Sequence, residues 1–386
     1  MKLVVVLEHH FIRCPEGVFT PLAFGYTFWQ EYLTVFDEVC VVARMGYKQY
    51  PPQDTLIASG DKVTFYDMTD YCGMWDFMAK FFPFMWRAMR VPQLGNSFIL
   101  FSGNVGVVVW FSLILRRKKY FFRCVGNVQL GIATENKNFL YKYIANVYHF
   151  ITKMQAKHAA ASSYTSDYLR RIYPNKNNKE YVFSNVELLD CVFSKPKTIE
   201  DFMQQPFRFI SVGRVEKQKG HHWLLQAVKH LKDEPLSIPW SVSIVGPGSQ
   251  MEPLQSYIDT HKLHNYVTFH GSIKWGKPLF DFLDKAHVFV LPSLTEGMSR
   301  ALLEGMARGL PSIASNTGGN PEVVSQDCLV DVGDILGLAE KMKSFMLETP
   351  KLVELSRSNW ETAQKFKHNS TKQQFLRYTY ENSSSS

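Results

Sequence analysis

The sequence AHVFVLPSLTEGMSRALLE, residues 286–304, decides how the second half of this chain folds. It opens with an apolar run at 286–291 that is typical of a buried strand, and Pro292 ends the run. A short loop follows, and the spacing of apolar residues over 299–308 predicts a helix. This stretch is therefore expected to form a strand–loop–helix unit of an α/β sheet.

Two glutamates on this unit, Glu296 and Glu304, are candidate ligand-binding residues. Glu296 falls on the loop that leaves the strand, and Glu304 lies about two turns into the helix. In open α/β sheets, ligands bind just outside the carboxyl ends of the strands, and a helix N-terminus attracts anions. The spacing alone also fits two solvated glutamates on a surface helix, so the residues around them decide between these interpretations.

Those flanking residues resemble a known signature. The segment 292–311, with its Pro-Ser, Glu-Gly and Glu-Gly-Met-Ala elements, resembles the family-4 glycosyltransferases, and the likeness continues through 312–324. These are retaining enzymes with the GT-B fold that take a sugar from a nucleotide donor. The resemblance implies that Glu296 contacts the donor sugar during catalysis and that Glu304 holds the nucleotide ribose. It also implies donor contacts from the loop residues Gly297, Met298 and Ser299.

A second motif lies about eighty residues upstream and brings positive charge to a helix. The apolar run 207–212 is followed by Gly213-Arg214, then Lys219-Gly220, and then helical patterning. Glycine permits a tight exit from a strand, and two cations at a helix N-terminus make an anion site. The resemblance implies that Gly213, Arg214 and Lys219 bind the donor diphosphate, with both cations assisting catalysis.

The segment after the expected strand 267–269 is the candidate base pocket, with Ile273 as the donor-binding residue by resemblance. Trp275 is either part of that pocket or a packing aromatic. A dinucleotide fingerprint is missing after the first strand, which argues against a nicotinamide cofactor. The sequence also contains no Asp-x-Asp, so we expect no metal; the cations and helix dipoles would neutralise the diphosphate. The nucleoside diphosphate sugar is then a co-substrate, and no cofactor is expected.

The first half of the chain is expected to supply the acceptor side of the site. Its first strand is predicted at 3–7, followed by a long loop in which Gly17, by resemblance, lies near the donor phosphate. The family often carries a histidine after a later strand, and this chain has Asn127 there. Asn127 can form a hydrogen bond in the catalytic site but cannot act as a base. His9 or His10 could take the histidine's place, or either could be structural.

Chain length indicates two domains, because 386 residues exceed the roughly 250–300 at which a single core stops growing. We expect the α/β GT-B fold, with two Rossmann-like parallel-sheet domains facing across a cleft. Residues 1–187 would form the acceptor-binding domain, 188–206 a linker and 207–364 the nucleotide-sugar-binding domain. Residues 365–386 would be a helix that crosses back to the first domain, plus a disordered tail.

Composition bears on location. The six cysteines are far apart and form no CxxC, which is typical of reduced thiols in a cytoplasmic protein. Residues 97–115 carry no charge, and four basic residues follow them. That run is long enough to span a membrane, but a polar break at 102–104 favours a strand followed by a helix.

Positive charge is concentrated in the first half. Residues 1–190 contain 21 Lys and Arg against 15 Asp and Glu, a net charge of +6, whereas residues 191–386 have a net charge of +2. The segment 77–90 is aromatic and basic, and Lys142, Lys153 and Lys157 share one face of an expected helix at 138–158. These features suggest peripheral contact with an anionic membrane on its cytoplasmic face, or a core helix with solvated lysines. No nucleic-acid-binding motif accompanies the charge.

The sequence therefore indicates a retaining, metal-independent glycosyltransferase of the hexosyltransferase type. It would move a sugar from a nucleoside diphosphate sugar to a hydroxyl of a glycan or lipid-linked glycan, in cell-surface polysaccharide assembly. Two alternatives remain open. One is a nucleotide-sugar epimerase of the same fold, and the other is a non-catalytic, glycosyltransferase-like binding subunit.

Overall fold

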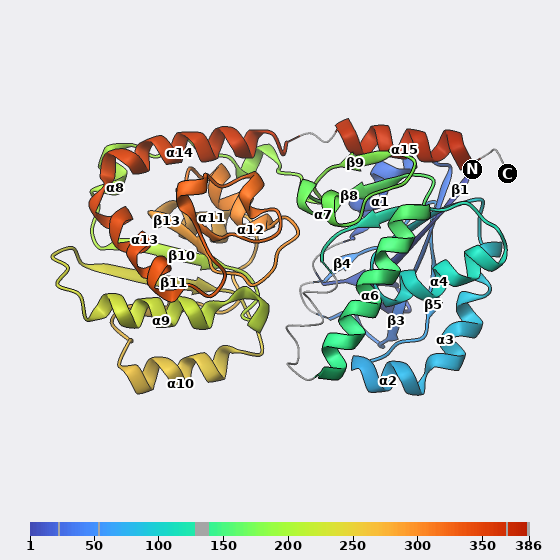
Figure 1. The fold of residues 1–386 in the computed structure, drawn as a ribbon, viewed down its shortest axis with the longest axis horizontal. Helices are drawn as coiled ribbons and strands as arrows, with labels where there is room; N and C mark the ends of the chain where they lie inside the picture. Colours follow the sequence, from blue (N-terminus) through green and yellow to red (C-terminus); the bar gives the residue numbers. More distant parts are fainter. Residues whose placement is uncertain (22–23, 53–54, 128–138, 368–369, 384–386) are drawn as a thin grey trace.

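The structure is a computed structural model of the chain, and it describes residues 1–21, 24–52, 55–127, 139–367 and 370–383. Figure 1 shows two α/β domains side by side along the long axis of the molecule. The blue-to-green domain comes from the first half of the chain, and the yellow-to-orange domain comes from the second half. The expected α/β class with two sheets of mainly parallel strands is confirmed.

The first sheet contains nine strands within the described residues. Parallel pairing places β1 between β3 and β6, and β7, β8 and β9 follow β6 in order. The strand order therefore reverses beside β1, between β3 and β6, which is where open sheets bind ligands. The bounds of the strands are β1 (Lys2–Cys14), β2 (Gly17–Thr20), β3 (Glu38–Tyr47), β4 (Leu56–Ile57), β5 (Val63–Met68), β6 (Ser97–Phe101), β7 (Phe121–Cys124), β8 (Ser162–Tyr164) and β9 (Glu180–Val182).

Helices cover both faces of this sheet, because its central strands are apolar on both sides. One face packs against the second to sixth helices of this domain, whose apolar side chains contribute to one core cluster. The opposite face packs against the first helix and the last. Their bounds are α1 (Tyr26–Leu33), α2 (Gly73–Ala79), α3 (Phe81–Ala88), α4 (Asn104–Leu115), α6 (Phe139–His158), α7 (Asp167–Ile172) and α15 (Ser370–Ser383).

The second sheet is parallel throughout, with six strands in the order β12-β11-β10-β13-β14-β15 among the described residues. Its strands are β10 (Phe207–Val212), β11 (Trp240–Val245), β12 (Val267–Phe269), β13 (Val288–Leu291), β14 (Ser312–Ser315) and β15 (Leu329–Val330). A single apolar core joins it to the surrounding helices. Those helices are α8 (Ile199–Phe202), α9 (His221–Lys232), α10 (Met251–His261), α11 (Lys277–Lys285), α12 (Arg300–Ala307), α13 (Ile335–Leu347) and α14 (Thr349–Gln364).

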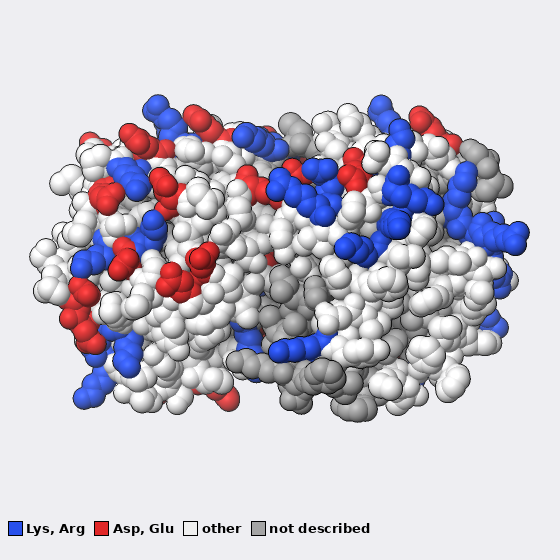
Figure 2. Space-filling view, in the orientation of Figure 1, with Lys and Arg blue, Asp and Glu red and all other residues white. Residues whose placement is uncertain are grey.

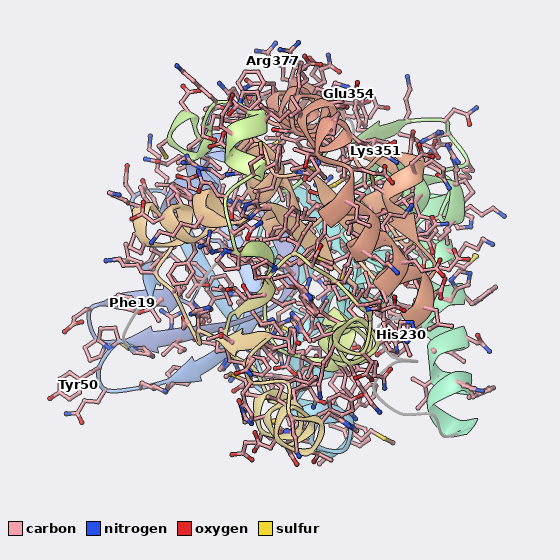
Figure 3. All side chains as sticks on the ribbon, turned by 90° about the vertical axis from the view of Figure 1, so that its left-hand side faces the viewer. Phe19, Tyr50, His230, Lys351, Glu354 and Arg377 are labelled. Atoms are coloured by element: carbon pink, nitrogen blue, oxygen red, sulfur yellow. The ribbon has the colours of Figure 1, made fainter. Side chains whose placement is uncertain are left out.

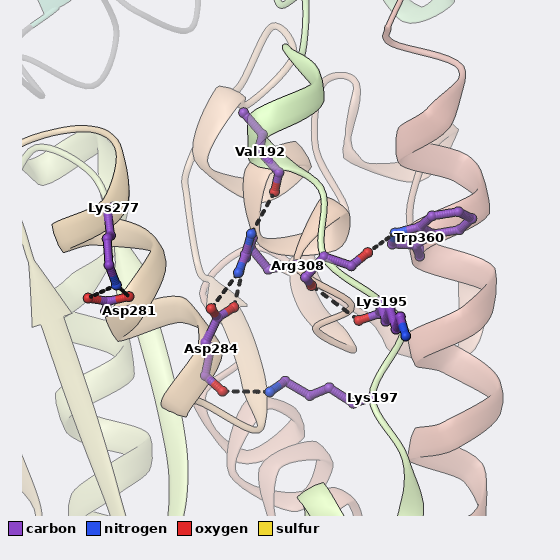
Figure 4. A network of polar contacts seen from close by, with 9 residues as sticks. Val192, Lys195, Lys197, Lys277, Asp281, Asp284, Arg308 and Trp360 are labelled. Atoms are coloured by element: carbon purple, nitrogen blue, oxygen red, sulfur yellow. Dashed lines mark hydrogen bonds and ion pairs between the residues drawn. The ribbon is translucent and has the colours of Figure 1, made fainter.

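The segment between the two sheets is held against the second domain by the polar contacts in Figure 4. Arg308, at the end of α12, donates to the carboxylate of Asp284 and to the carbonyl of Val192. Lys197 donates to the carbonyl oxygen of Asp284 at 2.7 Å, and the Trp360 indole donates to a linker carbonyl at 2.6 Å. These contacts make the segment part of the second domain's surface.

The last helix, α15, lies on the first domain, at the top of Figure 1. Phe375 and Leu376 are buried in the core beneath it, and Ser383 donates to the hydroxyl of Ser97 at 2.7 Å. The chain therefore crosses between the domains a second time. Ser383 is still helical, so the disorder expected for the tail concerns residues that lie outside the described part.

The prediction for the start of the chain is wrong in its extent. β1 does not end near residue 7 but runs to Cys14, and it forms an antiparallel hairpin with β2. His9 and His10 therefore lie within a strand, and Gly17 begins the next strand rather than lying in a long loop. The turn residues Pro15 and Glu16 allow the chain to reverse there. In Figure 3 this hairpin, with labelled Phe19, projects from the side of the molecule opposite α6.

The uncharged run 97–115 forms β6, a short turn and α4. Every residue of β6 is buried, and Gly103 has a positive φ of 143° at the turn into the helix. The interpretation of this run as a strand followed by a helix, based on the polar break at 102–104, is therefore confirmed. None of the described helices has the length and apolar character needed to cross a membrane.

Candidate active site

The connection between β10 and α9 brings cations to the end of the second sheet. Gly213 leaves the strand, a single 3-10 turn spans Lys217–Lys219, and Gly220 begins the approach to the helix with φ of 66°. A side chain at Gly220 would overlap the carbonyl oxygen of Pro292, at the end of β13. Glycine at this position thus lets the turn lie directly against the loop that follows β13.

Lys219 and Glu296 form the centre of the candidate site. The Lys219 Nζ atom lies 2.6 Å from Oε1 of Glu296, although 77 positions separate the two residues in the chain. Ser293 donates to the same carboxylate oxygen at 2.7 Å. The Glu296 side chain is only 8% exposed, so a close cation and a hydroxyl compensate its charge where water has little access.

The loop carrying Glu296 meets the first domain. A Cβ atom on Gly297 would lie 2.5 Å from the carbonyl oxygen of Val125, just beyond the carboxyl end of β7. The backbone N–H of Tyr168 also donates to Glu322 of the second domain at 2.8 Å. A cavity of about 320 Å³ lies between the domains here, bordered by Met298 and Glu322 on one side. The carboxyl ends of the two sheets therefore face each other at this point.

Glu304 lies in the first two turns of α12 and is almost fully buried. The Ser299 hydroxyl caps the helix, accepting from the backbone N–H of Leu302. Trp275 donates its indole N–H to Oε1 of Glu304 at 2.9 Å, and Arg300 lies 3.7 Å from the same oxygen. Burial raises the pKa of the Glu304 carboxyl, whereas Trp275 and then Arg300 lower it. This carboxyl is thus a buried acceptor, and one of its two oxygens, Oε1, already accepts a hydrogen bond.

The remaining predicted residues of the second domain differ in position. Arg214 is exposed beside this site, and Gly213 lies close to the aliphatic part of the Lys219 side chain. Ile273 is partly buried and packs against the apolar core of the second domain. Trp275, by contrast, is 45% exposed while its N–H holds Glu304. The sequence identified Trp275 as a pocket candidate but gave no sign of its bond to Glu304.

Asn127 lies on the first-domain side, just after β7, and is 8% exposed. Its carboxamide donates to the hydroxyl of Tyr168 at 3.3 Å and accepts from that of Tyr173 at 3.3 Å. Both tyrosines therefore orient it within the first domain. The other candidates lie elsewhere on this sheet: Gly17 in the hairpin, and His9 against the Thr20 hydroxyl at 2.8 Å.

The two histidines differ in their surroundings. Burial lowers the pKa of His9 to about 4, with smaller effects from His10 and Arg44, so His9 is neutral near pH 7. His10 is more exposed and lies 3.0 Å from Asp70. Neither contact reaches Glu296, and the roles of Gly17, His9, His10 and Asn127 in the reaction remain predictions.

Glu8 is a further candidate residue, and the sequence assigned no role to it. It lies where the strand order reverses, and its Oε2 atom accepts from the backbone N–H of Val105 at the start of α4, at 2.9 Å. Its Oε1 atom accepts from the Tyr71 hydroxyl at 2.6 Å and lies 3.1 Å from Arg44. Asn104 in turn donates to the Tyr71 hydroxyl at 2.9 Å. The signal available in the sequence was a charged residue immediately after the apolar run 3–7.

Together these groups can bind a ligand that carries both phosphate and hydroxyl groups. Cations and a helix N-terminus suit phosphate, and buried carboxylates accept hydrogen bonds from sugar hydroxyls. Among the described residues, no group of three or more His, Cys, Asp or Glu side chains is placed to hold a metal ion.

Comparison with known proteins finds glycosyltransferases among the similar sequences. Residues 206–347 match the family model described as Glycosyl transferases group 1. Protein CapJ of Staphylococcus aureus is 25% identical over 358 residues, which cover 90% of this chain and 87% of CapJ. The Escherichia coli UDP-Gal:alpha-D-GlcNAc-diphosphoundecaprenol alpha-1,3-galactosyltransferase is 37% identical over 134 residues, which cover 33% of this chain and 34% of that enzyme.

The fold agrees over the whole chain. Sucrose-phosphate synthase from Thermosynechococcus elongatus superposes with a TM-score of 0.72 at 16% identity, covering 100% of both chains. The chain thus has the fold of the GT-B glycosyltransferases, and most of its second domain matches the group 1 model. The resemblance inferred from its sequence is confirmed, with the group 1 match lying in the second domain.

Proposed function

We propose that this protein transfers a sugar from a nucleoside diphosphate sugar to a hydroxyl of a glycan or lipid-linked glycan, with retention at the anomeric carbon and without a metal ion. The observation that carries the proposal is the contact between Lys219 and Glu296 at the end of the second sheet. It joins the expected phosphate-binding cation to the expected sugar-binding carboxylate. The loop that bears Glu296 also meets the first domain.

In the proposed reaction, the bond between the anomeric carbon and the β-phosphate oxygen breaks, and the acceptor oxygen bonds to that carbon on the same face. The acceptor's proton passes to the departing phosphate, so no separate base is required. Lys219, Arg214 and the N-terminus of α9 stabilise the negative charge that develops on the diphosphate.

The contacts of Lys219 and Glu304 suggest how the donor binds. Lys219 and Glu296 form an ion pair, and the Trp275 indole donates a hydrogen bond to Glu304. We infer that the diphosphate takes over Lys219 while a sugar hydroxyl donates to Glu296. The ribose hydroxyls would donate to Glu304 beside or in place of the indole. Each exchange replaces one polar contact with another, so no buried polar atom is left without a hydrogen bond.

The donor and acceptor are proposed from relatives and from the first domain. The related galactosyltransferase is named for UDP-Gal and a diphosphoundecaprenol-linked acceptor. We infer a UDP-sugar donor and a lipid-linked acceptor for this chain. The Glu8, Tyr71 and Asn104 cluster presents carboxylate, hydroxyl and amide groups where the strand order reverses. We infer that this cluster binds the acceptor's hydroxyl groups.

A lipid-linked acceptor requires access to a membrane, and the outer surface of the first domain suits one. Met78, Phe81, Phe82 and Trp86 on α2 and α3 are 60%, 39%, 83% and 58% exposed, whereas Phe84 is buried in the core. α3, α4 and α6 contain no acidic residue. We infer peripheral contact of this face with the anionic cytoplasmic side of a membrane. A protein that sediments with neither neutral nor anionic vesicles would contradict this placement.

Donor binding can be tested by thermal unfolding with UDP-, GDP- and ADP-sugars. We expect the UDP-sugars to raise the unfolding midpoint, because a ligand at a hundred times its dissociation constant adds about 2.7 kcal/mol. The shift should be unchanged by EDTA. If no nucleotide sugar stabilises the protein, the proposed enzymatic function fails and a non-catalytic binding subunit becomes the better interpretation.

A further inference from the structure

A cavity of about 800 Å³ lies at the end of the first domain away from the donor site. Its walls are the loop after α4, the end of α6, the turn before β9 and one residue of α15, Tyr378. These segments precede β7, β8 and β9, so the cavity is at the amino ends of the strands. The loop of Glu296, in contrast, lies beyond the carboxyl end of β7. The cavity is therefore separate from the cleft between the domains.

The lining of this cavity is strongly positive, and we call it the cationic pocket. The basic side chains that line it are Arg117, Lys118, Lys119, His158, Lys176 and Lys179. No acidic side chain is present among the described residues that line it. Figure 2 shows Lys and Arg side chains gathered at the upper right of the molecule, over the end of α6 and beside α4.

Two tight turns fix these cations in place. Arg117 has a left-handed backbone with φ of 53°, which is unfavourable for a residue with a side chain. The N–H groups of Arg117 and Lys118 both donate to carbonyls in the last turn of α4 at 2.9 Å. On the facing turn, the Asn175 carboxamide donates to the end of α6, as does the backbone of Lys176 at 3.2 Å. The like charges are thus held together by rigid backbone.

The electrostatic consequence is visible at His158. Burial lowers the pKa of this histidine, and the nearby Lys176 and Lys157 lower it further. Clustered like charges destabilise a folded protein. A bound anion would remove that repulsion, and ammonium and guanidinium groups suit the oxygens of a phosphate.

The rim of the pocket is apolar on one side. Ile114 lines the pocket and is 45% exposed, and the neighbouring Phe111 and Leu115 on α4 are 45% and 71% exposed. A phosphate seated among the cations would therefore have apolar surface beside it. This combination matches an amphiphile with a phosphate head and hydrocarbon chains better than it matches a freely soluble metabolite.

We propose that the cationic pocket is a binding site for the phosphate group of an anionic membrane lipid. This inference rests on the membrane contact proposed above and adds a specific anchor to it. The pocket would fix the orientation of the first domain on the membrane. The cleft, at the opposite end of that domain, would stay open to the donor.

The test uses co-sedimentation of the full chain with phosphatidylcholine vesicles that contain increasing amounts of phosphatidylglycerol. Lys118→Gln with Lys176→Gln changes the pocket, and Lys142→Gln with Lys153→Gln removes the same charge from exposed positions on α6. We expect the pocket variant to lower partitioning at least about tenfold more than the α6 variant. The reason is that a direct phosphate contact adds charge-assisted hydrogen bonds to the long-range attraction. Equal losses in the two variants would overturn the pocket while leaving the membrane contact intact.

Further arms separate the sources of phosphate. Phe82→Gln with Trp86→Gln should abolish the binding that survives high salt without altering the pocket variant's salt-dependent loss. Glycerol 3-phosphate is a soluble phosphate ester, and it should not raise the unfolding midpoint at concentrations at which lipid vesicles already saturate the protein. Tight binding of glycerol 3-phosphate would overturn the proposal that the ligand is a lipid. Loss of oligonucleotide binding, rather than vesicle binding, in the pocket variant would also overturn it. A UDP-sugar shift that persists in every variant shows that a failure here is not a failure of the donor site.

Discussion

Replacing Lys219 with alanine should lower turnover by about a hundredfold or more, by analogy with the loss of one preorganised donor to a developing oxyanion. The Nζ atom is held 2.6 Å from Glu296, so it is already in place where the diphosphate would leave. Its interaction strengthens as the leaving group gains charge, and therefore the effect falls mainly on the rate. Steady-state kinetics with a UDP-sugar would measure this.

Lys217→Ala is the matched control, because Lys217 is exposed on the same 3-10 turn. It should retain near-normal turnover. Thermal unfolding of both variants would show whether Glu296, left without its cation, destabilises the fold. Strict dependence of the wild-type rate on added Mg²⁺ or Mn²⁺ would contradict the assignment of phosphate neutralisation to Lys219 and Arg214.

The two glutamates should separate binding from turnover. Glu304→Ala is expected to weaken affinity for the free nucleoside diphosphate by roughly 10- to 100-fold, because hydrogen bonds to a charged group contribute about 1.5–3 kcal/mol. Glu296→Gln should lower turnover by a similar factor yet leave nucleoside diphosphate affinity unchanged or slightly higher. That variant releases Lys219 from its carboxylate partner and makes it more available to phosphate.

Isothermal titration with UDP, together with turnover measurements, would check both variants. Glu252→Ala, an exposed change on α10, serves as a control that should alter neither quantity. Equal loss of nucleotide affinity in the Glu296 and Glu304 variants would show that the division of roles is wrong.

The elements that could be predicted from the sequence are those with strong local signals. The strand β13 and helix α12 follow from the apolar run, the proline and the helical spacing, which together placed Glu296 on a loop and Glu304 on a helix. Gly213 and Gly220 likewise indicated a strand–turn–helix connection. Periodicity is reliable here because each element buries a continuous apolar core.

The misses come from contacts between segments that are distant in sequence. The extent of β1 beyond residue 7 depends on pairing with β2 and with the end of β3, and local periodicity does not report that pairing. The bonds of Trp275 to Glu304 and of Tyr168 and Tyr173 to Asn127 are side-chain contacts made only in the folded chain. The cationic pocket could not be predicted either, because the two turns that form it are far apart in the sequence.

The most direct test of the proposed function is the anomeric configuration of the product. The protein would be incubated with α-linked UDP-sugars and a lipid-linked diphosphate sugar, and the new glycosidic linkage would be examined by proton NMR. Our account predicts that transfer occurs in the presence of EDTA and gives an α-linkage in the product. The Lys219→Ala variant should transfer sugar at no more than about a hundredth of the wild-type rate. A β-linked product, or conversion of the UDP-sugar to its epimer without transfer, would contradict it.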